Sequence, residues 1–307
     1  MHYRAGALIL LLLFPVSITW GQDTILVRHY QTHSRYEFGL KLLDLALRKN
    51  DAPYRIIAPQ KERINEARGH AMVVSGDLDI EFLMTSENLE SSTIPVRFPV
   101  YRGILGLRLL LVRTEDQEKF SRLQSVADLR QYTAGHGLHW NDLPVFAANN
   151  LSVETSTSYE SLFTQLKNHR FDYFHRGINE IWAEVAVHRD TLTIADNIML
   201  FYPHPVYFFV SKSRPELAEQ IERGLNRALA DGSYKQLFLQ HHQAFIDQAN
   251  FASRRLLILT NPLHGDDAVP IDTSWWLPAD LKRLRDQGSN AVPIHRVRDS
   301  ASRQPLR

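Results

Sequence analysis

The chain has 307 residues, of which 44% are hydrophobic, and this length leaves room for two lobes that each bury a core. Its 35 basic and 34 acidic side chains give a formal net charge of +1, which offers no electrostatic attraction to nucleic acid or to an anionic membrane surface. The chain has no cysteine, so disulfides, thiolate metal sites and thiol nucleophiles are excluded. The expected partner is therefore a small molecule.

The first residues have the order of a secretory signal peptide. Arg4 precedes a short apolar run, and small residues stand three and one before a cleavage point near Gln22. We therefore expect residues 1–21 to be a signal peptide that directs the protein to a bacterial periplasm. An uncleaved anchor is the alternative, because Trp20 is unusual so close to a cleavage site.

Apolar runs and helical patterns alternate through the first part of the mature sequence. The strands predicted from apolar runs are 24–30, 54–59, 77–85 and 106–113, and the helices predicted from amphipathic patterns are 36–49 and 61–76. Strands that alternate with helices in this way are typical of an α/β fold with largely parallel sheets.

A charged stretch at 114–123 is followed by a second set of alternating elements. The set comprises an opening segment at 125–137, a helix at 157–168, strands at 171–176 and 204–211, and a helix at 213–232. Thr157 with Glu160, and Ser213 with Glu216, have the spacing of a capping box, which predicts the two helix starts. Gly232 is the expected stop of the last helix.

The tail from residue 260 differs from the body in composition. Turn residues dominate it, yet it contains Trp275 and Trp276, and adjacent tryptophans indicate an extended segment docked on the body. After about Ser289 apolar side chains are sparse, and we expect disorder there. Residues 260–307 are thus predicted to be an extension that is docked in part and disordered at its end.

Four motifs follow one another in a fixed order along the chain. They are GDLDIEFLMT, IPVRFPVYRGILGLRLLLVR, SVADLRQYTAGHG and YESLFTQLKNHRFDYF. In this order they resemble the bacterial extracellular solute-binding proteins of family 3, the amino-acid-type periplasmic binding proteins. The resemblance spans roughly Thr24 to Leu277, and it departs from the family at Arg170, where glycine is usual.

The resemblance implies an α/β fold of the type II periplasmic binding proteins, with two lobes, two hinge crossings and a ligand cleft. Lobe one would combine residues 23–111 with 204–259, and lobe two would be residues 112–203. The implied function is capture of a small anionic or zwitterionic solute by lobe closure, for an ABC-type permease, by a monomer without cofactor or metal. A periplasmic ligand sensor that signals to a membrane receptor is an alternative with the same fold.

A hydrolase is the remaining alternative. The sequence contains no G-x-S-x-G elbow, no H-E-x-x-H pair and no P-loop, so no set of catalytic residues can be identified from their spacing. We therefore expect a binding protein and not an enzyme.

The stretch FDYFHRGINEIWAEV changes from the alternation of a strand to the period of a helix. Polar residues gather at the junction, which is where open α/β sheets bind ligands. In the order of the family this is the cleft-facing end of a lobe-two strand, so Arg176 and Glu180 are candidate ligand contacts. The alternative is that these two residues form only an exposed ion pair four positions apart.

Five further residues are candidate ligand contacts through the resemblance. Arg102 and Gly103 stand by the first crossing, Tyr30 follows the first strand, Thr85 matches a ligand-facing threonine, and Trp140 offers a stacking ring from lobe two. For Arg102 the alternative is an ordinary turn with a solvated arginine, and for Tyr30 it is a polar loop.

Two histidines and an aspartate lie close together in the stretch AGHGLHWND. His136, His139 and Asp142 are residue types that ligate zinc, but Gly137 weakens a helical arrangement of the histidines. We therefore predict no metal site.

Asn88 stands where amino-acid binders of this family usually carry an arginine, three residues after the ligand-facing threonine. Asparagine has no charge and cannot form the two parallel hydrogen bonds that an α-carboxylate receives from a guanidinium. Ordinary α-amino acids are therefore expected to bind weakly unless another residue supplies the charge. We expect Arg102 and Arg176 to bind an anionic part of the ligand from opposite lobes.

Overall fold

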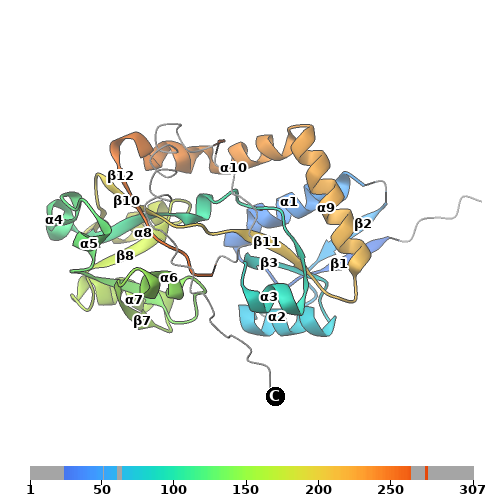
Figure 1. Cartoon of the computed structure of the whole chain (residues 1–307), viewed down its shortest axis with the longest axis horizontal. Helices are drawn as coiled ribbons and strands as arrows, with labels where there is room; N and C mark the ends of the chain where they lie inside the picture. Colours follow the sequence, from blue (N-terminus) through green and yellow to red (C-terminus); the bar gives the residue numbers. More distant parts are fainter. Residues whose placement is uncertain (1–23, 51, 61–63, 264–273, 276–307) are drawn as a thin grey trace, which may run out of the picture.

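Two groups of strands and helices lie side by side, and the chain passes between them more than once (Figure 1). The computed structural model describes residues 24–50, 52–60, 64–263 and 274–275. The signal peptide predicted at 1–21 and the disorder expected after Ser289 lie outside these ranges. Within them, none of the helices combines the length and the apolarity that a membrane span requires.

Lobe one occupies the right-hand side of Figure 1 and contains two small sheets. Its strands are β1 (Ile25–Arg28), β2 (Tyr54–Ile57), β3 (Ile80–Met84), β4 (Ile94–Val96) and β11 (Val206–Val210). Its helices are α1 (Glu37–Arg48), α2 (Glu66–Ser75), α3 (Glu87–Ser92), α9 (Pro215–Ala230) and α10 (Ser233–Ala249), with the 3-10 turns η1 (Ser34–Tyr36) and η2 (Ile104–Gly106). Strands β1 and β2 pair in parallel, whereas β11 pairs antiparallel with both β3 and β4.

Lobe two is built on one seven-stranded sheet in the order β12-β10-β5-β8-β6-β7, with β9 also paired to β5. Its strands are β5 (Leu107–Arg113), β6 (Thr133–Gly137), β7 (Ser152–Ser156), β8 (Tyr173–Gly177), β9 (Leu192–Ile194), β10 (Ile198–Phe201) and β12 (Arg255–Ile258). Its helices are α4 (Gln117–Ser121), α5 (Val126–Leu129), α6 (Leu143–Ala148), α7 (Tyr159–Lys167) and α8 (Ile181–His188), with the 3-10 turns η3 (Thr114–Asp116) and η4 (Phe251–Ser253).

The seven-stranded sheet is mixed and the sheet of β3, β11 and β4 is antiparallel, so the expectation of largely parallel sheets is wrong. Among the described strands, the parallel pairs are β6 with β7, β6 with β8, β10 with β12 and β1 with β2. Strand β5 runs antiparallel to β8, β9 and β10. Two consecutive parallel strands of one sheet must be joined by a crossover connection. Strand β5 enters its sheet directly from lobe one, without such a connection, and runs antiparallel to its neighbours.

The structure divides the chain between the lobes differently from the sequence expectation. Strand β5 begins at Leu107 and pairs with β8, so lobe two takes residues before 112. Strand β12 lies beside β10, and Leu257 and Leu259 pack in the core of lobe two. Helix α10, which packs on α1 and α9 along the top of Figure 1, is therefore followed by a third passage between the lobes.

Two helix starts differ from the predicted capping boxes. Helix α7 is capped by Ser158 and not by Thr157, because the Ser158 side chain accepts the backbone N–H of Ser161. Helix α9 begins at Pro215, whose fixed φ suits the first helical position, and Ser213 bonds to Ser211.

The predicted stop of α9 is confirmed. Gly232 follows the end of the helix with φ of 80°, in the left-handed region that glycine adopts without strain.

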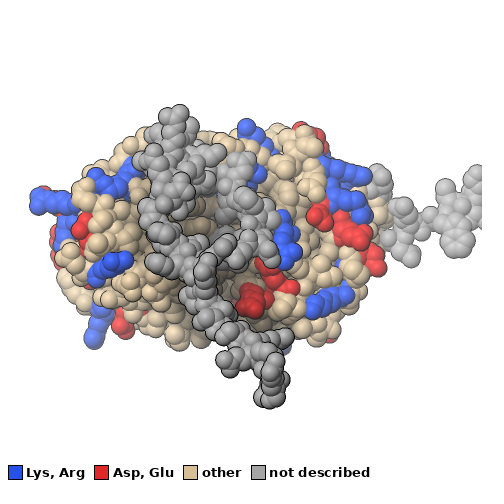
Figure 2. Space-filling view, in the orientation of Figure 1, with Lys and Arg blue, Asp and Glu red and all other residues tan. Residues whose placement is uncertain are grey.

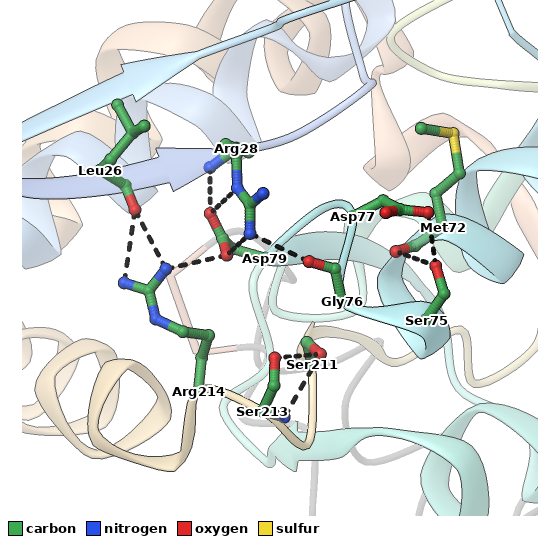
Figure 3. Close-up of polar contacts among 10 residues, drawn as sticks. All are labelled: Leu26, Arg28, Met72, Ser75, Gly76, Asp77, Asp79, Ser211, Ser213 and Arg214. Atoms are coloured by element: carbon green, nitrogen blue, oxygen red, sulfur yellow. Dashed lines mark hydrogen bonds and ion pairs between the residues drawn. The ribbon is translucent and has the colours of Figure 1, made fainter.

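The turn from Gly76 to Asp79 ties three elements of lobe one together (Figure 3). The fully buried Asp79 carboxylate accepts hydrogen bonds from the backbone and guanidinium of Arg28 at 2.7–2.9 Å and from Arg214 at 2.9 Å. Burial raises the pKa of Asp79, but the Arg28 hydrogen bonds and the Arg214 charge outweigh it and hold that pKa below its usual value. The end of β1, the start of β3 and the start of α9 are thereby fixed.

Charged side chains of both signs lie on the face seen in Figure 2. In Figure 2, Lys and Arg lie beside Asp and Glu at both ends of the visible face. This distribution agrees with the net charge of +1.

Candidate ligand-binding cleft

Three adjoining cavities, of about 170, 610 and 800 Å³, lie between the lobes. Arg35, Glu66 and Leu83 border all three, so the cavities are parts of one cleft. Lobe-two residues, Trp140 and Glu180 among them, border the opposite side. A molecule in this cleft would contact both lobes at once.

The lobe-one wall is formed by the turn after β1 and by the first turn of α2. The Asn65 side chain accepts the backbone N–H of Arg68, which fixes the start of α2 and places Glu66 in its first turn. One carboxylate oxygen of Glu66 accepts from the Tyr36 hydroxyl at 2.7 Å and from Arg35 at 2.9 Å. This wall therefore carries a ring, a cation and an anion in mutual contact.

The lobe-two wall is organised around Arg176, which is buried near the end of β8. Glu184 accepts from Nε and Nη2 of Arg176 at 2.7–2.9 Å, in the two-pronged geometry typical of buried pairs. The Arg176 guanidinium carbon lies 5.0 Å from the ring centre of Trp140 and 4.8 Å from that of Phe174. Arg176 thus holds the cleft-facing Trp140 in place.

Glu180 lies at the N-cap of α8 and turns back toward the end of β8. Its Oε2 accepts from Arg176 at 3.0 Å and from the Gly177 backbone at 3.3 Å. Burial raises the pKa of Glu180, but the charges of Arg176 and Arg108 lower it below its usual value. Glu180 is therefore an anion at neutral pH.

A buried polar network forms the floor of the cleft. Asp142 accepts from Nη2 of Arg108 at 3.0 Å and from the Tyr202 hydroxyl at 2.6 Å, and its other oxygen lies 3.1 Å from Nε2 of His136. Burial raises the pKa of Asp142, but the close contact with His136 and the charge of Arg108 hold it well below its usual value. The network joins the first residues of α6 to β5, β6 and the end of β10.

The histidines considered for zinc are separated by this arrangement. His136 is buried in the floor network, whereas His139 borders the 610 Å³ cavity. In the described part of the chain, no three His, Cys, Asp or Glu residues are grouped as a metal site requires.

Comparisons with known proteins give a fold and no close relative. No protein-family model matches the sequence, and no curated protein is significantly similar to it. An ancestral arginine-binding protein bound to arginine aligns over 72% of this chain and 99% of its own, with a TM-score of 0.51 at 16% identity. A periplasmic binding protein of Salmonella typhimurium with high arginine specificity aligns over 71% and 98%, with a TM-score of 0.50 at 15% identity.

A proposed ABC-transporter binding component from Wolinella succinogenes, complexed with lysine, aligns over 76% of this chain and 99% of its own, with a TM-score of 0.50 at 15% identity. This chain has the two-lobed fold of the periplasmic binding proteins. The α/β architecture with a ligand cleft, expected from the order of the motifs, is confirmed.

Three of the predicted site residues meet in the cleft of this periplasmic binding protein fold. Trp140, Arg176 and Glu180 border the 800 Å³ cavity from lobe two. Asn88, which replaces the usual arginine, borders the 610 Å³ cavity from lobe one.

The other four predicted contacts border none of the three cavities. The Tyr30 hydroxyl donates to buried Glu81 at 2.9 Å, and the Thr85 hydroxyl donates to Glu90 at 2.5 Å. These side chains are turned into lobe one, because they satisfy carboxylates there.

Arg102 and Gly103 form a tight turn with φ of 47° and 78°. The Arg102 guanidinium lies 3.7 Å from the ring centre of Trp275, which also packs on Tyr234 and Phe238 of α10 at 5.0 and 5.7 Å. The structure therefore does not bring Arg102 and Arg176 together.

Three further residues border the cleft that were not predicted from sequence: Tyr36, Glu66 and Arg108. Of these three, Arg108 could have been found from sequence, because an arginine near the start of the apolar strand LRLLLVR needs a buried partner. Tyr36 and Glu66 carry no comparable signal, since their positions depend on how α2 packs beside the turn after β1.

Proposed function

We propose that this protein is a periplasmic solute-binding protein that captures a small solute between its lobes and delivers it to an ABC-type permease. The cleft carries the proposal, because its 800 Å³ part is bordered by Glu66 from lobe one and by Glu180 from lobe two. Cavities of this size enclose small molecules, and a solute that contacts both walls favours the closed arrangement of the lobes.

The solved structures with the same fold support this proposal. They include proteins bound to arginine and to lysine, and one is a proposed component of an ABC transporter. With the predicted signal peptide removed, the mature chain would act in the periplasm as a monomer with a membrane permease as its partner. We assign no catalytic role to the residues of the cleft.

A thermal-shift screen of small metabolites against the mature protein tests the proposal. A solute at about a hundred times its Kd adds about 2.7 kcal/mol to the free energy of unfolding. Small-angle scattering with the same solute should show a smaller radius of gyration, because the lobes close. If no small solute shifts the transition, or if cleft residues prove to carry a hydrolase activity, the proposal is wrong.

A further inference from the structure

Carboxylates outnumber arginines among the described residues that line the cleft, by six to three. Each arginine already has a carboxylate partner: Arg35 pairs with Glu66 at 2.9 Å, Arg108 with Asp142 at 3.0 Å, and Arg176 with Glu184 at 2.7 Å. The cleft therefore carries a surplus of negative charge after its own ion pairs are formed.

Glu180 is the surplus carboxylate at the centre of the cleft. It borders both the 170 Å³ and the 800 Å³ cavities, and its side chain is 30% exposed. Oε2 is held by Arg176 and by the Gly177 backbone, whereas Oε1 accepts no hydrogen bond from any described residue. A residue that borders the space a solute would fill thus carries an ionised oxygen with open acceptor capacity.

His242 of α10 is a second polar group that borders the same 800 Å³ cavity without a hydrogen-bond partner. The side chain is 2% exposed, and neither ring nitrogen bonds to a described residue. Burial lowers the pKa of His242 to about 3, so the ring is neutral and one nitrogen is an acceptor. A buried acceptor without a donor is costly, and a solute N–H would satisfy it.

Aromatic rings complete the lining. Tyr36 borders the cleft from lobe one, and Trp140 and Tyr159 border it from lobe two, with Tyr159 39% exposed. Ring faces attract ammonium and guanidinium groups, and nearby carboxylates add to that attraction.

We propose that the cleft binds an organic cation, an alkylammonium or guanidinium, with Glu180 as the carboxylate that receives it and with no requirement for a carboxylate on the solute. The inference rests on the solute capture proposed above. It departs from the anionic or zwitterionic solute expected from sequence, because Arg176 directs Nε and Nη2 to Glu184 and Arg102 borders none of the cavities. Asn88 in place of an arginine removes the usual carboxylate clamp.

Calorimetry of the full chain with two matched pairs tests this proposal: arginine against agmatine, and lysine against cadaverine. Within each pair the cationic end is the same and only the α-carboxylate differs. Agmatine or cadaverine should bind at least as tightly as its parent amino acid. Glu180→Gln should weaken that binding by about ten- to a hundredfold, the effect of losing one hydrogen bond to a charged group.

Glu160→Gln is the matched control, because it makes the same charge change at an exposed residue of the cleft rim. It should change affinity by less than about threefold. If Glu180→Gln does not fold, Glu66→Gln makes the same test from lobe one, with weaker cation binding expected.

Two results would overturn the inference while leaving solute capture intact. One is arginine or lysine binding more than about tenfold tighter than its decarboxylated partner, which would reveal a carboxylate clamp. The other is tight binding of a dicarboxylate such as glutarate with no binding of any of the four cations. If no solute of any class binds, the proposed function fails and the inference fails with it.

Discussion

Arg176 borders the cleft, yet its hydrogen bonds are directed to the protein itself. Glu184 takes two prongs of the guanidinium, Glu180 takes a third contact, and the faces lie near Trp140 and Phe174. Its pKa is raised, because the neighbouring carboxylates outweigh the effect of burial. An arginine so engaged holds the ring of Trp140 and directs Nε and Nη2 to carboxylates of the protein itself.

Arg176→Leu should therefore be strongly destabilising. The substitution leaves the buried Glu184 carboxylate without its cation, and an uncompensated buried charge costs about 3–5 kcal/mol of unfolding free energy. Urea denaturation measures the loss. Arg223→Leu, which breaks the exposed pair with Glu219, is the control and should cost less than about 0.5 kcal/mol. Equal small losses in both variants would contradict the structural role of Arg176.

Helix α2 and strand β3 are joined by a buried carboxylate that accepts from two different elements. Glu81 of β3 is fully buried, and its oxygens meet the Tyr30 hydroxyl at 2.9 Å and Nδ1 of His70 at 2.6 Å. The hydrogen bond with Glu81 raises the pKa of His70, although burial opposes the shift. The contact between α2 and β3 is thus sensitive to pH.

His70→Gln should destabilise the protein more at about pH 5.5 than at about pH 8.5. Because the folded pKa of His70 lies above its unfolded value of about 6.5, the stabilisation is complete below that value and disappears as pH rises through the folded pKa. Thermal unfolding at the two pH values measures the difference. Tyr30→Phe removes the other hydrogen bond to Glu81, and its cost of about 1.5–3 kcal/mol should be the same at both. A pH-independent effect of His70→Gln would refute the assignment.

Elements whose signal is local could be predicted, and partners that depend on distant segments could not. The sequence of α1 has the apolar periodicity of an amphipathic helix, and that of β3 is a short apolar run. Both elements formed as expected. Local competition between neighbouring caps shifted the start of α7 by one residue, from Thr157 to Ser158. The sheet in which β12 lies depends on Leu256 meeting Met199, a pairing that no local pattern contains.

The site follows the same division. Arg176 and Glu180 were predicted because they stand at the end of a strand, where a cleft can be expected from fold alone, whereas Trp140 was predicted through the family resemblance. The ion pair of Arg176 with Glu180, considered from sequence as an exposed pair, forms at 3.0 Å with Arg176 buried. The partner Glu184 could not be predicted, since it reaches Arg176 only through the turn of α8. Glu66 meets Tyr36 only because α2 packs beside the turn after β1.

At the scale of the whole molecule, the lobes are interleaved along the chain. The Tyr234 hydroxyl of α10 donates to the carbonyls of Pro99 and Val100 in lobe one, yet twenty residues later β12 completes the sheet of lobe two. Trp275 then packs again on α10. Neither lobe is formed by one uninterrupted segment of the chain. The segments of each lobe are therefore connected through the other lobe.

Leu257→Ala in β12 should therefore lower the stability of both lobes together. Leu257 is buried in the core of lobe two, and removing such a side chain costs about 2–5 kcal/mol. Hydrogen exchange during urea unfolding reports on β3 in lobe one and on β6 in lobe two, and the two should keep a common midpoint that moves to lower urea. Leu42→Ala in α1, from the core of lobe one, is the matched control. It should also move the unfolding midpoints of β3 and β6 together to lower urea. If Leu257→Ala separates the transition into two, with β3 unchanged, the lobes unfold as independent domains and the third passage does not couple them.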